Sequence, residues 1–233
     1  MAEVARTLDG PIEVDELLHL ICLAAVDTVD GAEFAGITVA DRRGKMETRA
    51  ASHPIVHKVD ALQYELAQGP CIDAVGGGWQ ARSDDLRIDS RWPRYGPRAA
   101  ELGVLSQMGI ELFDEPGMIA ALNLYASTAE AFDDDTVETA MLFAIQAAHT
   151  LGRVMTQKQL TDAMRTRTTI AQAIGVVMQR YLLSPDRAFE FLTRVSRIND
   201  VTLEALAIQI VDEASHRRPQ PDSPTGGVGR PVF

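Results

Sequence analysis

Three runs of apolar residues with helical spacing occupy the stretch from Thr168 to Ala214. Within each run the apolar residues recur at three- and four-residue steps, which places them on one face of a helix. Two breaks separate the runs, one at Ser184-Pro185-Asp186 and the other at Asn199-Asp200. The first break supplies a capping hydroxyl, a proline suited to the first helical position and an acid for the first turn. We therefore predict a three-helix unit of about 45 residues, small enough that we expect it to depend on a partner for stability.

The polar side of this unit is rich in arginine. Its second helix carries a stripe of charged residues opposite the apolar face, made of Arg187, Glu190, Arg194 and Arg197. Guanidinium groups donate paired hydrogen bonds to phosphates and base edges, although a solvated helix face is the simpler interpretation of charge alone. Gly175 indicates a functional contact on the first helix. Glycine inside a helix costs about 1 kcal/mol of stability relative to alanine, so its presence suggests a close approach by backbone or ligand.

The same segment resembles the ANTAR domain, the RNA-binding antiterminator module of bacterial regulators. Two positions depart from the family pattern, because Ile174 stands where lysine is common and Leu182 stands where glycine or a polar residue is common. The first departure removes a cation from the face that the resemblance assigns to RNA. The matching residues cover the whole three-helix unit and are Arg167, Ile170, Ala173, Gly175, Val177, Met178, Arg180, Ser184, Ala188, Phe189, Leu192, Ser196, Asn199, Leu203, Ala207 and Ile210.

This resemblance implies a homodimer that binds tandem RNA hairpins in nascent transcripts and blocks the termination of transcription. Hairpin loops are readable because their unstacked bases expose their edges. DNA is not expected as a partner, since the break at Ser184-Pro185 is longer than the turn of a helix-turn-helix and Glu190 would enter the groove. We assign Arg180, Arg187, Arg194 and Arg197 to phosphates, and Arg167, Ala173, Gly175 and Asn199 to positions near the bases.

The part of the chain before this unit predicts an antiparallel sheet covered by helices. A turn with well-placed proline and glycine, Asp114 to Gly117, joins the last two predicted strands. Residues 76–78 and 83–93 are expected to be loops. The predicted helices span 12–30, 56–67, 71–75 and 95–102, and the predicted strands span 34–40, 45–51, 104–113 and 118–126.

This region resembles a GAF domain, a small-molecule-sensing module often paired with ANTAR in actinobacterial regulators. The resemblance rests on Gln68 to Ala74, on Asp84-Asp85-Leu86 with Arg91-Trp92-Pro93, and on the closing strand Met118 to Tyr125. The NKxDE-type signature of cyclic-nucleotide-binding GAF domains is absent, which disfavours that ligand. We expect an unidentified small molecule and no other cofactor, with Cys71, Asp73, Trp92 and Tyr125 as its candidate contacts.

A long helix is predicted to connect the two parts. Asp135 and Glu138 have the spacing of a capping box, and no proline occurs from Thr136 to Met164. The heptads are imperfect, so either a solvent-bridging helix or a paired helix from a second copy fits the pattern. We favour the paired coiled coil because the ANTAR family acts in dimers. The candidate seam is Val137, Met141, Ile145, Ala148, Leu151, Met155 and Gln159.

The predicted fold class is therefore α+β, with an N-terminal GAF-like antiparallel sheet with helices, a long connecting helix and a C-terminal three-helix ANTAR-like domain. The boundaries are 12–132 for the GAF-like domain, 133–165 for the connecting helix and 166–214 for the ANTAR-like domain. Residues 216–233 hold four prolines and three glycines, so residues 215–233 are expected to be a disordered tail.

Charge divides along the same boundary. The whole chain has a formal charge of −11, which argues against nucleic-acid binding. Residues 1–155, however, hold 12 basic and 25 acidic side chains, a net charge of −13, whereas residues 156–233 hold 10 basic and 8 acidic, a net charge of +2. This asymmetry indicates a division of labour, in which the arginine stripe lies on the part without excess acid.

Other function classes find less support in the sequence. No apolar run could span a membrane, the N-terminus lacks a secretory pattern, and two unpaired cysteines suit a reducing cytoplasm. The five histidines do not form a metal site, and Gly76-Gly77-Gly78 lacks the residues of a P-loop. We expect no catalytic residues and no enzyme activity. The alternative is a thiol-based redox sensor or enzyme centred on Cys71, whose C-terminal helices serve only for dimerisation.

Overall fold

The computed structural model describes residues 13–41, 43–115 and 118–216. The chain forms two compact units, Met1–Thr156 and Gln157–Phe233, and the division falls inside helix α5, Asp134–Tyr181. Most of the predicted tail lies outside the described residues, but its first two residues, Ser215 and His216, belong to helix α7. None of the described helices combines the length and the apolar character needed to cross a membrane.

The first unit is built on a five-stranded sheet in which every neighbouring pair is antiparallel. The strand order is β2-β1-β5-β4-β3, so β5 lies at the centre. Phe34 pairs with Tyr125 on one side of β5, and Ser106 pairs with Ala126 on the other. The strands are β1 (Phe34–Asp41), β2 (Met46–Ala51), β3 (Gln80–Ser83), β4 (Ser106–Glu115) and β5 (Met118–Ala126).

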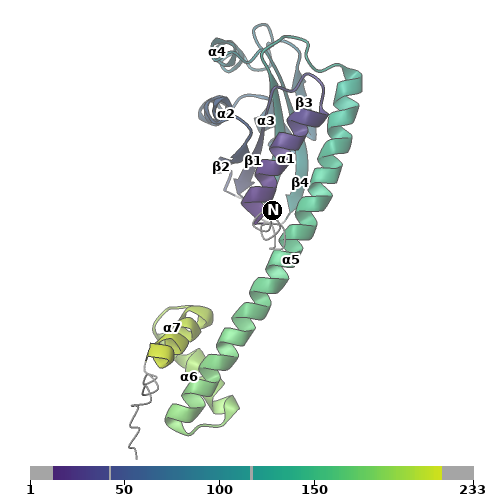
Figure 1. The fold of residues 1–233 in the computed structure, drawn as a ribbon. Helices are drawn as coiled ribbons and strands as arrows, with labels where there is room; N and C mark the ends of the chain where they lie inside the picture. Colours follow the sequence, from purple (N-terminus) through teal and green to yellow (C-terminus); the bar gives the residue numbers. More distant parts are fainter. Residues whose placement is uncertain (1–12, 42, 116–117, 217–233) are drawn as a thin grey trace, which may run out of the picture. The chain divides into compact units, whose positions relative to one another are not determined.

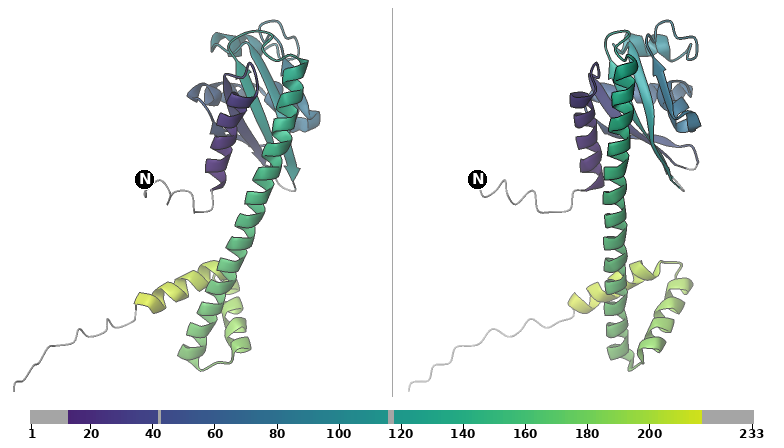
Figure 2. Two further views of the ribbon diagram at one scale, coloured as in Figure 1. Left: turned by 45° about the vertical axis from the view of Figure 1, so that its right-hand side comes forward. Right: turned by 90° about the vertical axis from the view of Figure 1, so that its right-hand side faces the viewer.

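Helices cover both faces of this sheet (Figures 1 and 2). One face packs against α1 (Val14–Thr28) and the first part of α5, which lie side by side. The other face packs against α2 (Pro54–Leu66), α3 (Pro70–Asp73) and α4 (Gly96–Glu101). Successive side chains of β5 point to opposite faces of the sheet and so contribute to both cores. Leu122 and Leu124 lie in the core beneath α1 and α5, whereas Tyr125 lies in the core beneath α2 and α4.

Two glycines let the second helical layer approach the sheet closely. Gly36 and Gly109 are the cross-strand partners of Asn123, one on each side of β5. A Cβ atom on Gly36 would lie 2.5 Å from Val56 Cγ1, and a Cβ atom on Gly109 would lie 2.8 Å from the carbonyl oxygen of Pro70. Any side chain at these positions would therefore push α2 or α3 away from the sheet.

One strand and one helix start differ from the prediction. Strand β3 was not predicted, because its sequence QARS is short and polar and lies at the edge of the sheet, where it pairs only with β4. An irregular helical turn, Ala74–Gly78, precedes it and is kinked at Gly77, whose φ is 93°. The cap of α5 is Asp133, whose Oδ1 accepts a hydrogen bond from the backbone N–H of Thr136 at 2.8 Å. The expected cap, Asp135, already lies in the first helical turn.

The predicted coiled-coil seam on α5 is largely used inside the first unit. Leu151 is buried in the core with α1 and the sheet, together with Ala140, Ala144 and Ala147. Val137, Met141 and Met155 pack partly buried against the same core. Of the apolar side chains on this part of α5, Leu142 is 60% exposed and Ile145 is 50% exposed. Helical spacing identified apolar positions but not the partner against which each of them packs.

The second unit contains the last part of α5, α6 (Pro185–Ile198) and α7 (Leu203–His216), as the three-helix prediction required. Ser184 caps α6, with its side chain accepting from the backbone N–H of Arg187. Leu182 adopts a left-handed conformation with φ of 52°, which explains why this position favours glycine. The core consists of Ala173, Val177, Ala188, Leu192, Leu206 and Ala207.

Candidate functional sites

The arginine stripe lies on the exposed side of α6. Ala188, Leu192 and Ser196 are buried on one side of this helix, which turns the charged residues to solvent. Arg187, Glu190, Arg194 and Arg197 are all exposed. Within residues 13–216, leaving aside 42, 116 and 117, no carboxylate forms an ion pair with any of these three arginines. Their guanidinium groups are therefore free to bind an anion.

An open groove runs along this surface of α6. Its lining combines an aromatic ring, an aliphatic side chain, a hydroxyl, a carboxylate and two guanidinium groups. Phe189 is 46% exposed in it, although a phenylalanine gains most when it is buried. Helical spacing places Phe189 outside the apolar face, a signal that could have marked it as a site residue. The lining residues are Phe189, Glu190, Thr193, Arg194, Arg197 and Ile198.

The other predicted RNA contacts are distributed over α5 and the end of α6. Arg167, Gly175 and Arg180 are exposed on α5. A Cβ atom on Gly175 would have no atom within 4 Å, so packing within the chain does not account for this glycine. Asn199 is exposed at the end of α6, where its Nδ2 donates to the carbonyl oxygen of Val195 at 3.0 Å.

Two positions of the first helix face inward. Ala173 is fully buried in the core of the second unit, where α5 packs against the other two helices, so its side chain is not on the exposed surface. Its small size instead allows the helices to pack closely. Ile174, which replaces the common lysine, packs partly buried against the same core. The departure from the family pattern therefore adds apolar contact as well as removing a cation.

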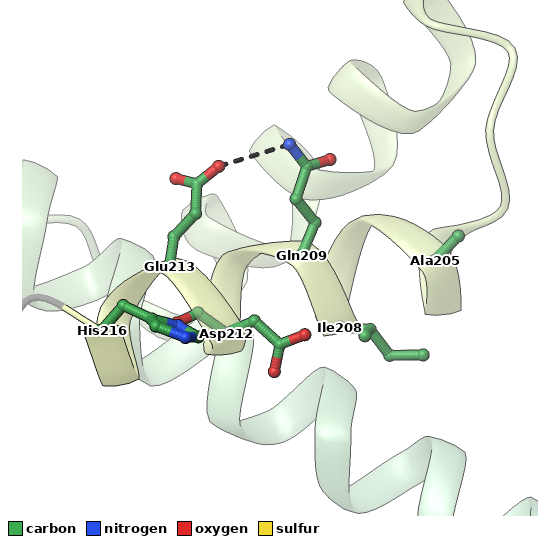
Figure 3. Close-up of a pocket in the computed structure, with 6 residues that line it drawn as sticks. All are labelled: Ala205, Ile208, Gln209, Asp212, Glu213 and His216. Carbon is green, nitrogen blue, oxygen red and sulfur yellow. Dashed lines mark hydrogen bonds between the residues drawn. The ribbon is translucent and has the colours of Figure 1, made fainter.

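Helix α7 presents a contrasting surface (Figure 3). Its open pocket is formed by one face of the helix, and its polar residues are mainly acceptors. Gln209 donates a hydrogen bond to Glu213 at 3.3 Å, and the Asp212 side chain points away from this pair (Figure 3). This acidic surface repels phosphate, which leaves α6 as the better candidate for RNA. The pocket is lined by Ala205, Ile208, Gln209, Asp212, Glu213 and His216.

The interior of the first unit holds a buried polar network. Asp60 of α2 accepts hydrogen bonds from the hydroxyl of Tyr125, from Thr48 Oγ1 at 2.7 Å and from Gln63 Nε2 at 3.2 Å. Burial raises the pKa of the Asp60 carboxyl from 3.8 to about 6, although these hydrogen bonds and the nearby His57 act in the opposite direction. A buried carboxyl at the sheet face is thus poised to change charge near pH 6.

Cys71 belongs to the same network. Its backbone N–H donates to Gln63 Oε1 at 3.0 Å, and its thiol receives a hydrogen bond from Asn123 Nδ2 at 3.2 Å. Burial, followed by the charge of Asp60, raises the pKa of the Cys71 thiol to about 12. Since the thiolate is the reactive form, the geometry gives no support to an activated Cys71. In the described part of the chain, no cluster of three or more His, Cys, Asp or Glu side chains could hold a metal ion.

Three of the four candidate ligand contacts are buried side chains. Cys71 and Tyr125 are fully buried in the polar network, and Trp92 is buried beneath α2 and α4. Trp92 Nε1 donates to Asp73 Oδ2 at 3.1 Å, while the guanidinium of Arg91 lies 4.3 Å from the centre of the Trp92 ring. The structure thus buries Cys71, Trp92 and Tyr125, whereas Asp73 is exposed at the end of α3, where it accepts from Trp92.

Two further polar side chains of this interior were not predicted from the sequence. Asn123 Nδ2 also donates to Thr38 Oγ1 at 2.9 Å, and Gln107 Oε1 accepts from the hydroxyl of Tyr95. Among the described residues, Asn123 Oδ1 and Gln107 Nε2 are buried without a hydrogen-bond partner. No sequence motif marks Asp60 or Gln107, because the tyrosines that bond them, Tyr125 and Tyr95, come from other segments of the chain.

Replacing Asp60 with asparagine is expected to reduce the pH dependence of stability. Because the folded-state pKa of Asp60 is raised, its contribution to stability is complete below about pH 4 and is lost as the pH rises through about 6. The complete loss is on the order of 3 kcal/mol, of which about 2 kcal/mol falls between pH 4.5 and pH 7.5, and an uncharged asparagine removes it. Denaturant unfolding at pH 4.5 and pH 7.5 measures the difference for both proteins. Asp27→Asn, at an exposed position on α1, is the control; equal pH dependence in wild type and Asp60→Asn would contradict the prediction.

Comparison with known proteins agrees with both halves of the structure. The sequence pattern of the GAF domain matches residues 12–151, more than half of the chain. The sequence pattern of the ANTAR domain matches residues 158–211. Both resemblances predicted from the sequence are therefore confirmed. Among curated proteins, none matches this sequence closely enough to count as a relative.

Solved structures resemble this chain at low sequence identity. A domain described as part of a two-component sensor histidine kinase protein from Sinorhizobium meliloti has 13% identity and a TM-score of 0.52, covering 64% of this chain and 98% of that one. GAF3 of a Synechocystis protein, in its photoproduct state, has 9% identity and a TM-score of 0.51 over 64% and 99%. A type II free methionine-R-sulfoxide reductase from Thermoplasma acidophilum has 15% identity and a TM-score of 0.48 over 61% and 97%. The first two likenesses show the fold alone.

Proposed function

Because the chain belongs to the GAF domain family and carries an ANTAR domain after it, we propose that it is a signal-responsive antiterminator that binds paired RNA hairpins as a dimer. An ANTAR domain implies RNA-binding antitermination regulation, and a GAF domain implies the sensing of a signal. Beyond what the two domains imply, we propose that the protein is a dimer, that it binds tandem hairpins and that the residues named below hold the RNA. Nascent transcripts as targets would place this action in the cytoplasm.

The exposed arginine stripe of α6 is the observation that carries the proposal. Arg187, Arg194 and Arg197 face solvent without carboxylate partners in the described part of the chain. Arginine is suited to RNA because its planar fork donates two parallel hydrogen bonds to one phosphate. The segment from residue 156 onward has a formal charge of +2, so it avoids the acidity of the GAF domain. Loop bases and loop phosphates are the proposed targets.

A second copy of the chain is the proposed partner of the α1 and α5 layer. Leu20 and Leu23 of α1 and Leu142 and Ile145 of α5 are exposed, although many other apolar residues of α1 and of the first part of α5 are buried in the GAF core. Leucine and isoleucine side chains on neighbouring helices form an apolar surface that a symmetric copy could cover. This surface takes the place of the seam that helical spacing predicted.

The proposed signal is a small polar molecule that enters the interior of the GAF domain. Cys71 and Tyr125 would contact it there, together with Asp73 and Trp92 at the neighbouring hydrogen-bonded pair. The buried atoms Asn123 Oδ1 and Gln107 Nε2 lack partners, so a molecule that both donates and accepts hydrogen bonds would satisfy them. Because this interior is packed in the structure, binding would have to move α2 or α3 away from the sheet.

Binding to an RNA with two adjacent stem-loops is expected to exceed binding to a single stem-loop by at least about tenfold, because the second contact becomes intramolecular. Log K should also fall steeply with log salt, since bound phosphates release counterions. A salt titration with both RNAs and with a duplex DNA of equal length measures these differences. Equal affinity for all three nucleic acids would argue against the dimeric antiterminator.

A further inference from the structure

Phe189 is the aromatic residue of α6 that the packing of the domain leaves unexplained. Its neighbours Ala188 and Leu192 are buried in the core of the three helices. Phe191, two residues further on, packs against Tyr181, with ring centres 5.3 Å apart. Phe189 is 46% exposed and forms part of the open groove on the arginine side of the helix. An exposed aromatic ring beside guanidinium groups is a surface that suits a nucleobase.

The groove has the dimensions of a short piece of single-stranded chain. Phe189, Thr193 and Arg197 lie four residues apart, so they form a row about 12 Å long at 1.5 Å per residue. The aromatic ring lies at one end of this row and a cation lies at the other. Arg194 lines the groove one residue beyond Thr193 and adds a second cation. One end therefore suits the flat face of a base, and the other suits phosphate.

We propose that an unpaired base of the RNA loop stacks on Phe189 while Arg194 and Arg197 hold the adjoining phosphates. Stacking needs no particular base, since every base has a π-face, so Phe189 supplies affinity for unpaired RNA over duplex. Glu190, which lines the same groove, repels phosphate and accepts hydrogen bonds. It therefore favours a base edge that presents an amino group. This inference rests on the proposed RNA-binding function and names the group that distinguishes a loop from a stem.

The test compares Phe189→Leu with Phe189→Tyr and with Phe191→Leu. Leucine keeps apolar bulk but removes the aromatic face, and tyrosine retains that face. Phe191→Leu is the matched control, because Phe191 is on the same helix and is 37% exposed but already has Tyr181 as its aromatic partner. Full-length protein is titrated with a paired stem-loop RNA in which each loop adenine in turn is replaced by 2-aminopurine. Dissociation constants and 2-aminopurine fluorescence are recorded, and melting curves verify that each variant folds.

Phe189→Leu is expected to weaken binding roughly 5- to 100-fold and to abolish the fluorescence change of one loop position. Phe189→Tyr and Phe191→Leu should both retain that change. If wild type binds the RNA and Phe189→Leu binds it equally well with an unchanged fluorescence signal, the stacking role is wrong while RNA binding stands. A lowered dimer stability with unchanged RNA affinity would make the groove a protein interface and would also overturn the proposal. Failure of wild type to bind any stem-loop refutes the RNA-binding function itself.

Discussion

Replacing Arg194 and Arg197 together with alanine is expected to weaken RNA binding about 100-fold or more, because each hydrogen-bonded contact with a charged group contributes about 1.5 to 3 kcal/mol. Both side chains are exposed on α6 and line the groove that contains Phe189. Two phosphate contacts fewer should also reduce the slope of log K against log salt by about 1.4 for single-stranded RNA. Filter binding or fluorescence anisotropy across a range of salt concentrations measures both quantities.

The matched control is the double variant Arg87→Ala/Arg98→Ala in the GAF domain. Arg87 and Arg98 are half-exposed and pair with Asp85 and Glu65, so this variant removes the same number of charges away from the RNA-binding domain. Its RNA affinity is expected to stay close to that of wild type. An equal loss in both double variants would show that net charge, rather than the α6 surface, determines binding.

Glutamate at both Leu142 and Ile145 is expected to separate the dimer and to remove most of the preference for paired hairpins. Linking two binding events raises apparent affinity by about 10² to 10⁴, and a monomer forfeits that gain. These two side chains are 60% and 50% exposed, so the substitutions place charge on the surface without entering the GAF core. Sedimentation velocity reports the oligomeric state, and titration with one or two stem-loops reports the preference.

Ile88→Glu is the companion control for the dimer. Ile88 is 81% exposed, more than any other large apolar residue in the described part of the GAF domain, and lies in the segment between β3 and α4. It should leave both the sedimentation coefficient and the preference for paired hairpins unchanged. A Leu142→Glu/Ile145→Glu protein that remains dimeric would move the interface to another surface.

Local sequence signals predicted most of the secondary structure. Ser184-Pro185 located the start of α6 because a cap and a first-turn proline act within one helical turn. The two strands predicted on either side of Asp114–Gly117 lie within two residues of β4 and β5, and β4 extends to Glu115. Strand β3 escaped prediction, since its four residues are polar and owe their conformation to pairing with β4. Signals that act over a few residues can be read from the chain, whereas pairing with a distant strand cannot.

The sites were predicted less completely, for the same reason. The arginines of α6 follow from helical spacing, and the structure places them on the exposed side of that helix. Ala173 was assigned to RNA by resemblance, whereas the structure buries it in the core of the three helices. Its burial was not foreseen because helical spacing does not say which small residue serves helix packing. In the GAF domain, Asp60 and Tyr125 meet across 65 positions of sequence, and nothing local to either residue predicts the bond. Contacts of this kind emerge only with the fold.

The alternation of β5 limits how a signal could travel through the sensor. Its leucines at 122 and 124 lie in the apolar layer, and its asparagine and tyrosine at 123 and 125 lie in the polar one. Sliding the strand by one position would exchange the two sets and bury amide and hydroxyl groups in hydrocarbon. The register of the central strand β5 is therefore fixed. A signal from the polar interior would therefore be transmitted by tilts or shifts of the helices on either side, while the register of the sheet stays unchanged.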